Sequence, residues 1–172
     1  TMVTIPESVT NIGNVVFHSC HCLTSVEIPE SVKSIGYAAF SFCDNLQSVN
    51  IPSGVTRLEM CTFNDCESLT SVTIPETVTD IGDGVFQDCR SLTSVEIPAG
   101  VTNVGNCVFV SCSSLMSVTY MGDAPNTLGA SIYGFTPTNL TTYVRGGSMG
   151  WNGDPESAEI PELWPVGDEE AR

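Results

Sequence analysis

The sequence predicts a right-handed repeat solenoid that is mainly β, in which each coil adds one short strand to a parallel sheet along one face. Two ladders of residues predict it, because Ile-Pro pairs and phenylalanines both recur every 23 residues without a slip. A fixed period of roughly 20 to 50 residues indicates similar coils that bury their apolar side chains against one another. The Ile-Pro pairs begin at Ile5, Ile28, Ile51, Ile74 and Ile97, and the phenylalanines are Phe17, Phe40, Phe63, Phe86 and Phe109.

The strand of each coil is visible in residues 23–28, Leu-Thr-Ser-Val-Glu-Ile, where apolar and polar side chains alternate. Successive side chains of a strand point to opposite faces. We therefore expect Val26 and Ile28 to point into the core while Ser25 and Glu27 point outward. The segment also matches the L-x-x-L-x-L pattern of leucine-rich repeats.

The remainder of the coil returns the chain to the start of the next strand. Pro29 has no N–H for a strand ladder, so the strand should end there. Val32 and Ile35 offer inward residues to a second extended piece, and Gly36 permits the bend that follows it. Residues 37–40 are expected to form a short helical or 3-10 turn that places a phenylalanine in the core.

The chain divides into a leucine-rich repeat array over residues 1–145 and a C-terminal capping segment with an acidic tail over residues 146–172. The array holds five 23-residue repeats and a divergent sixth, whose Leu128 falls 24 residues after its counterpart. Terminal repeats are atypical because they close the open end of the core. Trp151 and Trp164 are the side chains expected to cover it.

The first residues align with the middle of a strand, since Val3 and Ile5 match Val26 and Ile28. No polar segment is present to cover the first coil, and we therefore expect further repeats upstream in a longer protein. An uncovered strand edge can also pair with another chain. Edge-to-edge self-association through this strand is a further expectation.

The consensus of the repeats, L-T-S-V-x-I-P-x-x-V-T-x-I-G-x-x-V-F-x-x-C, resembles that of the BspA-like leucine-rich repeat family. The resemblance extends to about residue 145. The segment 143–151 is similar to the ends of such arrays, with Arg145 where a proline is common. The resemblance implies a bacterial, less often protist, secreted or cell-surface protein whose repeats mediate adhesion to host proteins or other cells. It provides no catalytic residues.

Composition narrows the possible partners. Twenty acidic residues face five lysines and arginines, which gives a formal net charge of −15. Nucleic-acid binding is not expected, because phosphates require a basic surface. Membrane insertion is not expected either, since no stretch approaches the ~20 consecutive apolar residues of a spanning helix.

Five of the eight cysteines form a ladder of their own, three residues after each phenylalanine. Equivalent Cβ atoms in stacked coils should remain at about the strand spacing, which exceeds the ~3.5–4.5 Å of a disulfide. We expect buried free thiols that act as small hydrophobic side chains. The ladder consists of Cys20, Cys43, Cys66, Cys89 and Cys112.

Residues 18–22, His-Ser-Cys-His-Cys, bring together four donors that zinc or copper accepts. The repeat argues against a metal site, because Cys20 belongs to the inward ladder while the other three positions vary freely between coils. Calcium at Asp80, Asp83 and Asp88 is disfavoured by spacing, which differs from a calcium loop. No metal, cofactor or catalytic constellation is expected.

The candidate interaction surface is the outer side of the predicted sheet, a polar strip with hydroxyl groups in rows. Solenoids commonly bind partners on a strand face, although repetition alone could also leave the strip unused. The strip residues are Ser25, Ser48, Ser71, Ser94 and Ser117 in one row and Glu27, Asn50, Thr73 and Glu96 in the next.

Three apolar residues interrupt otherwise polar positions and form a second candidate contact. Tyr37 stands where other coils have asparagine or aspartate, and Met60 occupies the same position one coil later. Phe42 replaces serine or aspartate. Grouped apolar residues on a surface mark contact sites, whereas single ones carry no such meaning.

These observations predict a non-catalytic protein-binding or adhesion module of a secreted or cell-surface bacterial protein, with an extracellular or host protein as partner. The alternative is a carbohydrate-binding or spacer region of a larger secreted enzyme, with a glycan as partner. The two differ in one sequence feature, because glycan binding favours exposed aromatic rings and the predicted strip has none.

Overall fold

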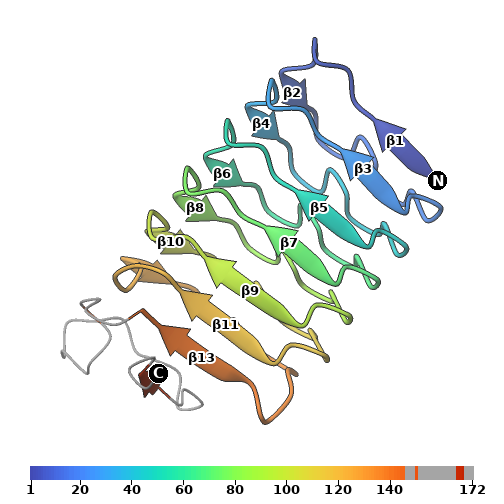
Figure 1. Cartoon of the computed structure of the whole chain (residues 1–172). Helices are drawn as coiled ribbons and strands as arrows, with labels where there is room; N and C mark the ends of the chain where they lie inside the picture. The colour runs from blue at the N-terminus through green and yellow to red at the C-terminus, as the bar shows by residue number, and fades with distance from the viewer. Residues whose placement is uncertain (146–149, 151–165, 169–172) are drawn as a thin grey trace.

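The computed structural model describes residues 1–145, 150 and 166–168. It is a stack of similar coils that begins at the N-terminal end, at the upper right of Figure 1. One face, here the main strand face, carries the longer strand of each coil. The main strand face consists of β1 (Met2–Thr4), β3 (Ser25–Glu27), β5 (Ser48–Asn50), β7 (Ser71–Thr73), β9 (Ser94–Ile97), β11 (Ser117–Tyr120), β13 (Thr141–Val144) and β14 (Val166–Asp168).

A second strand face runs alongside the first and carries a two-residue strand from each coil (Figure 1). Its strands are β2 (Asn11–Ile12), β4 (Ser34–Ile35), β6 (Arg57–Leu58), β8 (Asp80–Ile81), β10 (Asn103–Val104) and β12 (Thr127–Leu128). All strand pairs are parallel, and the register joins equivalent positions, as in Val3 with Val26 and Ser48 with Ser71. The predicted parallel solenoid is confirmed.

The strand ladders have two interruptions. On the main strand face, β1-β3-β5-β7 and β9-β11-β13-β14 form separate hydrogen-bonded groups. On the second strand face, β2-β4 is separate from β6-β8-β10-β12. Because the interruptions fall between different coils, each pair of neighbouring coils remains joined by at least one face.

The third side of each coil, here the turn face, contains no helix, so the prediction of short helical or 3-10 turns is wrong for the described residues. Ala38 and Phe42 have φ angles of 48° and 60°, which a right-handed helical turn excludes. The left-handed residues allow alternate N–H groups to point to the next coil. Ala38, Phe40 and Phe42 donate to Met60, Thr62 and Asn64, at 3.1, 2.9 and 2.8 Å.

The core is a column of aromatic rings inside the turn face. Neighbouring phenylalanines stack with ring centroids 5.1 Å apart at Phe17–Phe40 and 5.9 Å at Phe63–Phe86, and Tyr133 continues the column beyond Phe109 at 5.8 Å. Parallel rings at this spacing combine dispersion with the burial of large apolar surfaces. Each coil is thus stabilised only by its neighbours, as the period predicts.

The C-terminal cap is described only in part. Strand β14 pairs with β13, with Thr142 opposite Val166, so the parallel sheet continues past the divergent sixth repeat. The predicted roles of Trp151 and Trp164 lie outside the described residues. Across the described ranges, no helix is long and apolar enough to cross a membrane.

Candidate functional site

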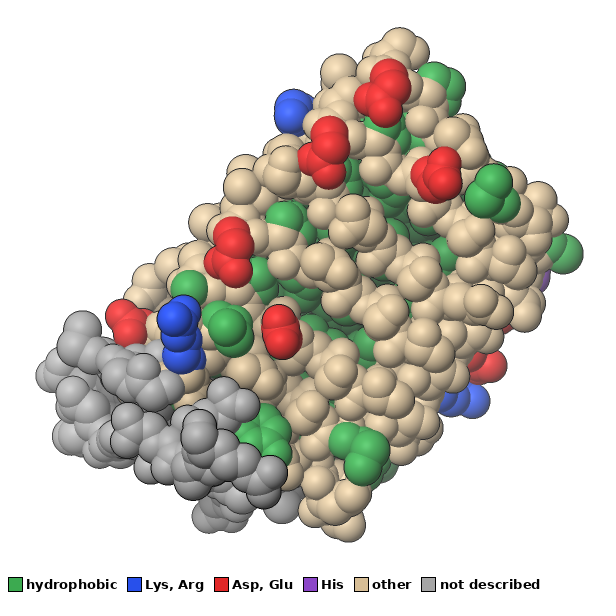
Figure 2. All heavy atoms as spheres, in the orientation of Figure 1, with side chains coloured by type: hydrophobic (Ala, Val, Ile, Leu, Met, Phe, Trp, Pro, Cys, Tyr) green, Lys and Arg blue, Asp and Glu red, His purple; other side chains and the backbone are tan. Residues whose placement is uncertain are grey.

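The outer side of the main strand face is a strip of small polar side chains. Its inward residues, such as Val49 and Val95, are buried, while the serines and the residues two positions later point outward, as predicted. Figure 2 views this face, where acidic side chains lie apart from one another among neutral ones. Whether the strip binds a partner stays a prediction.

The residue before a strip serine can also bond to the preceding coil. Thr70 donates through its hydroxyl to the carbonyl of Gln47 at 3.0 Å, and its backbone N–H reaches the same oxygen at 2.9 Å. Met116, 58% exposed, interrupts this row with an apolar side chain. The strip is therefore largely neutral and held in register by the coils beneath it.

The three apolar residues predicted to mark a contact patch are exposed but lie in two places. Tyr37 and Met60 are 43% and 46% exposed and occupy equivalent positions at the start of the turn face. Phe42, 39% exposed, lies at its far end against His18, with ring centroids 5.3 Å apart. Tyr37 instead lines a groove on the second strand face, described next.

A row of glycines allows close stacking where the second strand face meets the turn face. A Cβ atom on Gly105 would lie 2.6 Å from the backbone of Gly82 and Asp83 in the preceding coil. Gly36 is packed just as tightly, 2.7 Å from the carbonyl carbon of Gly13. Glu59 occupies this position in the third coil, where no side chain fits without separating the coils.

The backbone hydrogen bonds show that separation directly. At each of the remaining steps of the second strand face, two backbone N–H groups donate to carbonyls of the preceding coil. For example, Thr79 donates to Thr56 at 2.9 Å and Gly82 donates to Leu58 at 2.9 Å. Neither bond is present between β4 and β6, where Thr56 and Glu59 would be the donors. We call this opening the seam.

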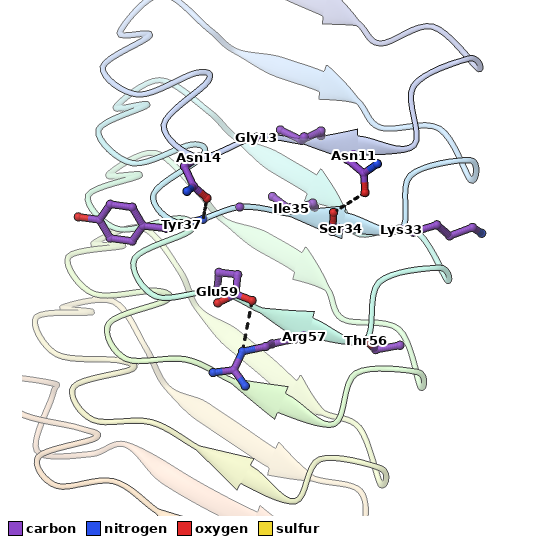
Figure 3. Close-up of a pocket in the computed structure, with 12 residues that line it drawn as sticks. Asn11, Gly13, Asn14, Lys33, Ser34, Ile35, Tyr37, Thr56, Arg57 and Glu59 are labelled. Atoms are coloured by element: carbon purple, nitrogen blue, oxygen red, sulfur yellow. Dashed lines mark hydrogen bonds and ion pairs between the residues drawn. The ribbon is translucent and has the colours of Figure 1, made fainter.

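The seam lies in a groove of about 730 Å³. Figure 3 shows Lys33 and Tyr37 at its opposite ends, with Asn11 and Ser34 on one side and Arg57 on the other. A second hollow of about 320 Å³ on the same face shares residues with the groove. The residues common to both hollows are Arg57 and Glu59.

Charged groups in the groove are only partly paired. The Nε atom of Arg57 lies 3.3 Å from Glu59, and its Nη1 atom lies 3.7 Å from Asp80. Hydrogen bonds from the Thr79 hydroxyl and from the side-chain amide of Asn103 lower the pKa of the Asp80 carboxyl, which therefore stays ionised beside the arginine. Lys33 donates from Nζ to the carbonyl of Glu30 at 3.2 Å.

The position that Tyr37 and Met60 occupy has a structural role in other coils. There the side-chain oxygen of an asparagine or aspartate accepts a backbone N–H from the next coil, as Asp83 does from Asn106 at 2.8 Å. Asn14 does the same for Tyr37 at 3.0 Å. Neither tyrosine nor methionine can replace that acceptor, so both coils beside the seam lack this bond.

The donors of residues 18–22 are bound to different partners. His21 Nδ1 lies 2.7 Å from a carboxylate oxygen of Asp44, while His18 Nδ1 lies 2.8 Å from the Ser19 hydroxyl. Among residues 1–145, 150 and 166–168, no three metal-ligating side chains are grouped. Of these two contacts, the one between His21 and Asp44 joins neighbouring coils.

The cysteine ladder has a role that its sequence pattern did not reveal. Cys43, Cys66, Cys89 and Cys112 are free and fully buried. Each thiol donates to the carbonyl of the phenylalanine 26 residues earlier, and Cys112 reaches Phe86 at 3.1 Å. Burial raises the pKa of Cys43 and Cys112 to about 12, so the thiols keep their protons and remain donors.

Carboxylates also stack along the turn face. Asp65 and Asp88 hold equivalent left-handed positions, and burial together with the charge of Asp88 raises the pKa of the Asp65 carboxyl. Arg90 offsets this repulsion, with its guanidinium 3.3 Å from Glu67 and 3.6 Å from Asp88. The group is a surface charge network.

Sequence comparison agrees with the architecture. Residues 1–116 match the BspA type Leucine rich repeat region in six copies, and the chain belongs to this family. No curated protein matches the chain significantly.

Solved structures show the same coil. A Treponema pallidum leucine rich repeat protein has 28% identity and a TM-score of 0.71, over 83% of this chain and 68% of that one. A leucine-rich repeat protein from Bacteroides ovatus has 25% identity and a TM-score of 0.62, over 83% of this chain and 47% of that one. A leucine rich cell surface protein from Faecalibacterium prausnitzii has 31% identity and a TM-score of 0.61, over 86% of this chain and 38% of that one.

Proposed function

We propose that the chain is a non-catalytic protein-binding or adhesion module of a secreted or cell-surface bacterial protein. The observation that carries this proposal is the main strand face, a strip of largely neutral polar side chains supported by a buried core of stacked coils. Repeat solenoids use such extended faces for broad contacts with partners. The similarity to a leucine rich cell surface protein supports the location.

The strip is suited to a protein partner for physical reasons. Short side chains such as Ser48, Ser71 and Ser94 lose little conformational freedom on binding, so they add little to the entropic cost of association. Their hydroxyls donate and accept, which permits hydrogen bonds with backbone groups of either kind. Glu27 and Glu96 supply separated charges on the strip itself.

The proposal is tested by binding of the chain to immobilised extracellular-matrix proteins. Ser71→Glu places a carboxylate in the middle of the strip, and Ser113→Glu adds the same charge on an exposed position elsewhere. We expect saturable binding that Ser71→Glu weakens at least about tenfold, while Ser113→Glu retains it. Binding that both variants retain in full would exclude the strip as the contact surface.

A further inference from the structure

Four departures from the repeat lie in the two coils that flank the seam. Lys33 replaces a threonine, and Glu59 replaces the closely packed glycine. Tyr37 and Met60 replace the asparagine or aspartate that accepts a backbone N–H. Local rules broken together without a compensating contact are typical of functional sites.

We propose that the groove at the seam binds one carboxylate-bearing sugar unit of an acidic glycan. This site is separate from the main strand face, so it does not depend on the function proposed there. The groove's volume of about 730 Å³ is in the usual range for small-ligand sites, which hold a few precisely placed polar groups.

The carboxylate is recognised by the guanidinium of Arg57. Lys33 lines the groove from the neighbouring coil, but its Nζ atom donates to the carbonyl of Glu30 and its side chain points away from Arg57 (Figure 3). Arg57 is 55% exposed, and Glu59 and Asp80 contact only its Nε and Nη1 atoms. Its Nη2 atom remains available, and arginine forms charge-assisted hydrogen bonds that fit a planar carboxylate.

The uncharged lining suits the rest of a sugar. The backbone N–H groups of Thr56 and Glu59, and the carbonyls of Lys33 and Ile35, lack the bonds that their counterparts make in other coils. These donors and acceptors match sugar hydroxyls, which both donate and accept. At one end of the groove the exposed ring of Tyr37 points outward (Figure 3) and offers a rigid apolar surface to a neighbouring sugar unit, with little entropy to lose.

An extended peptide fits this groove less well. Pairing of a peptide strand needs a free sheet edge. Strands β4 and β6 are two residues each, their outer edges are already paired with β2 and β8, and their unpaired edges face each other.

The probe is a hyaluronan tetrasaccharide, which carries glucuronate carboxylates, titrated into the full chain and followed by backbone amide NMR signals. Chitotetraose, which is neutral, and tetraglutamate, which is an acidic peptide, are the comparison ligands. We expect saturable shifts at Gly36, Thr56 and Glu59 with hyaluronan, and at least about tenfold weaker binding of the other two. No saturable shift with hyaluronan, or tighter binding of tetraglutamate, would overturn the proposal.

Two variants test the named contacts and leave the seam open. Arg57→Asn installs the residue of the equivalent position Asn103, and Tyr37→Met installs the residue of the equivalent position Met60, which restores no acceptor. Each should weaken hyaluronan binding at least about tenfold, since each removes one anchoring contact. Arg90→Ser removes the same charge as Arg57→Asn from another face and should retain binding. An equal loss of hyaluronan affinity in Arg57→Asn and Arg90→Ser would show that binding depends only on net charge, and it would exclude the groove as the site.

Discussion

The turn face and the second strand face are built from the same coils, yet only one of them is continuous. On the turn face, three N–H groups donate to the next coil in every step, from Val15 with Tyr37 to Ser111 with Gly134. On the second strand face, the step between β4 and β6 has neither of its usual bonds. The hydrogen-bond ladder of the turn face therefore tolerates substitutions that the ladder of the second strand face does not.

The reason lies in where side chains point. On the turn face the varied positions, such as Phe42 and Asp65, carry outward side chains on left-handed residues, so the ladder beneath is unaffected. On the second strand face a side chain at the glycine position cannot point to solvent, because its Cβ atom would meet the backbone of the preceding coil. Glu59 occupies this position at the step where the bonds of the second strand face are missing.

The largest expected effect is in the aromatic column. Phe86→Ala removes a fully buried ring that stacks between Phe63 and Phe109, and should lower the free energy of unfolding by about 3–5 kcal/mol. Urea denaturation followed by circular dichroism measures this. Phe135→Ala, on a ring that is 88% exposed, is the control. A loss below 1 kcal/mol in Phe86→Ala would contradict a column that stabilises every coil.

A second seam can be created by design. Gly105→Ala places a Cβ atom 2.6 Å from the backbone of Gly82 and Asp83, which should separate these coils and break the bond from Gly105 to Ile81. We expect a loss of about 1–3 kcal/mol in unfolding free energy. Gly13→Ala is the matched control, because its Cβ atom would meet only Val16 at 3.4 Å. Equal stability of both variants would exclude close packing as the cause of the seam.

The thiol ladder predicts a dependence of stability on pH. Burial raises the pKa of Cys112 to about 12 from the ordinary value of 9.0, so above that ordinary value the unfolded chain releases a proton that the folded chain retains. Stability is thus fully present below pH 9 and declines as pH rises toward the folded value. We expect Cys112 to contribute about 1.4 kcal/mol less at pH 10 than at pH 8.

The measurement is the difference in unfolding free energy between the native chain and Cys112→Ala at the two pH values. That difference should shrink by the stated amount at the higher pH. Cys22→Ala, which removes an exposed thiol, controls for the substitution itself. A constant difference between native chain and Cys112→Ala would show that the thiol is not held in its neutral form.

The smallest expected effect is closure of the native seam. Glu59→Gly restores the glycine row and allows the N–H groups of residues 56 and 59 to regain their backbone bonds. We expect slower hydrogen exchange at both amides and a gain of about 1 kcal/mol or less, because glycine's entropy cost offsets part of the new bonding. Glu76→Gly removes a carboxylate elsewhere as control. Unchanged exchange at both amides would mean that Lys33, not Glu59, holds the seam open.

The sequence by itself determined the coil. The period of 23 residues specifies which side chains stack, so the register, the aromatic column and the buried cysteines followed from it. It also located Tyr37, Met60 and Phe42 as exposed departures from the pattern. Glu59 in the glycine row was visible in the same way, and comparing that row across coils would have found the seam.

Only the tertiary structure decided how the turn face is made and what the substitutions do together. Residues 37–40 carry no local signal for left-handed conformations, which arise because their N–H groups bond to the next coil. The thiol donors have the same origin, since their acceptors lie 26 residues away. Lys33, Tyr37 and Glu59 line one groove because neighbouring coils bring them together. The repeat pattern predicts the path of each coil, but it does not predict the spacing between coils.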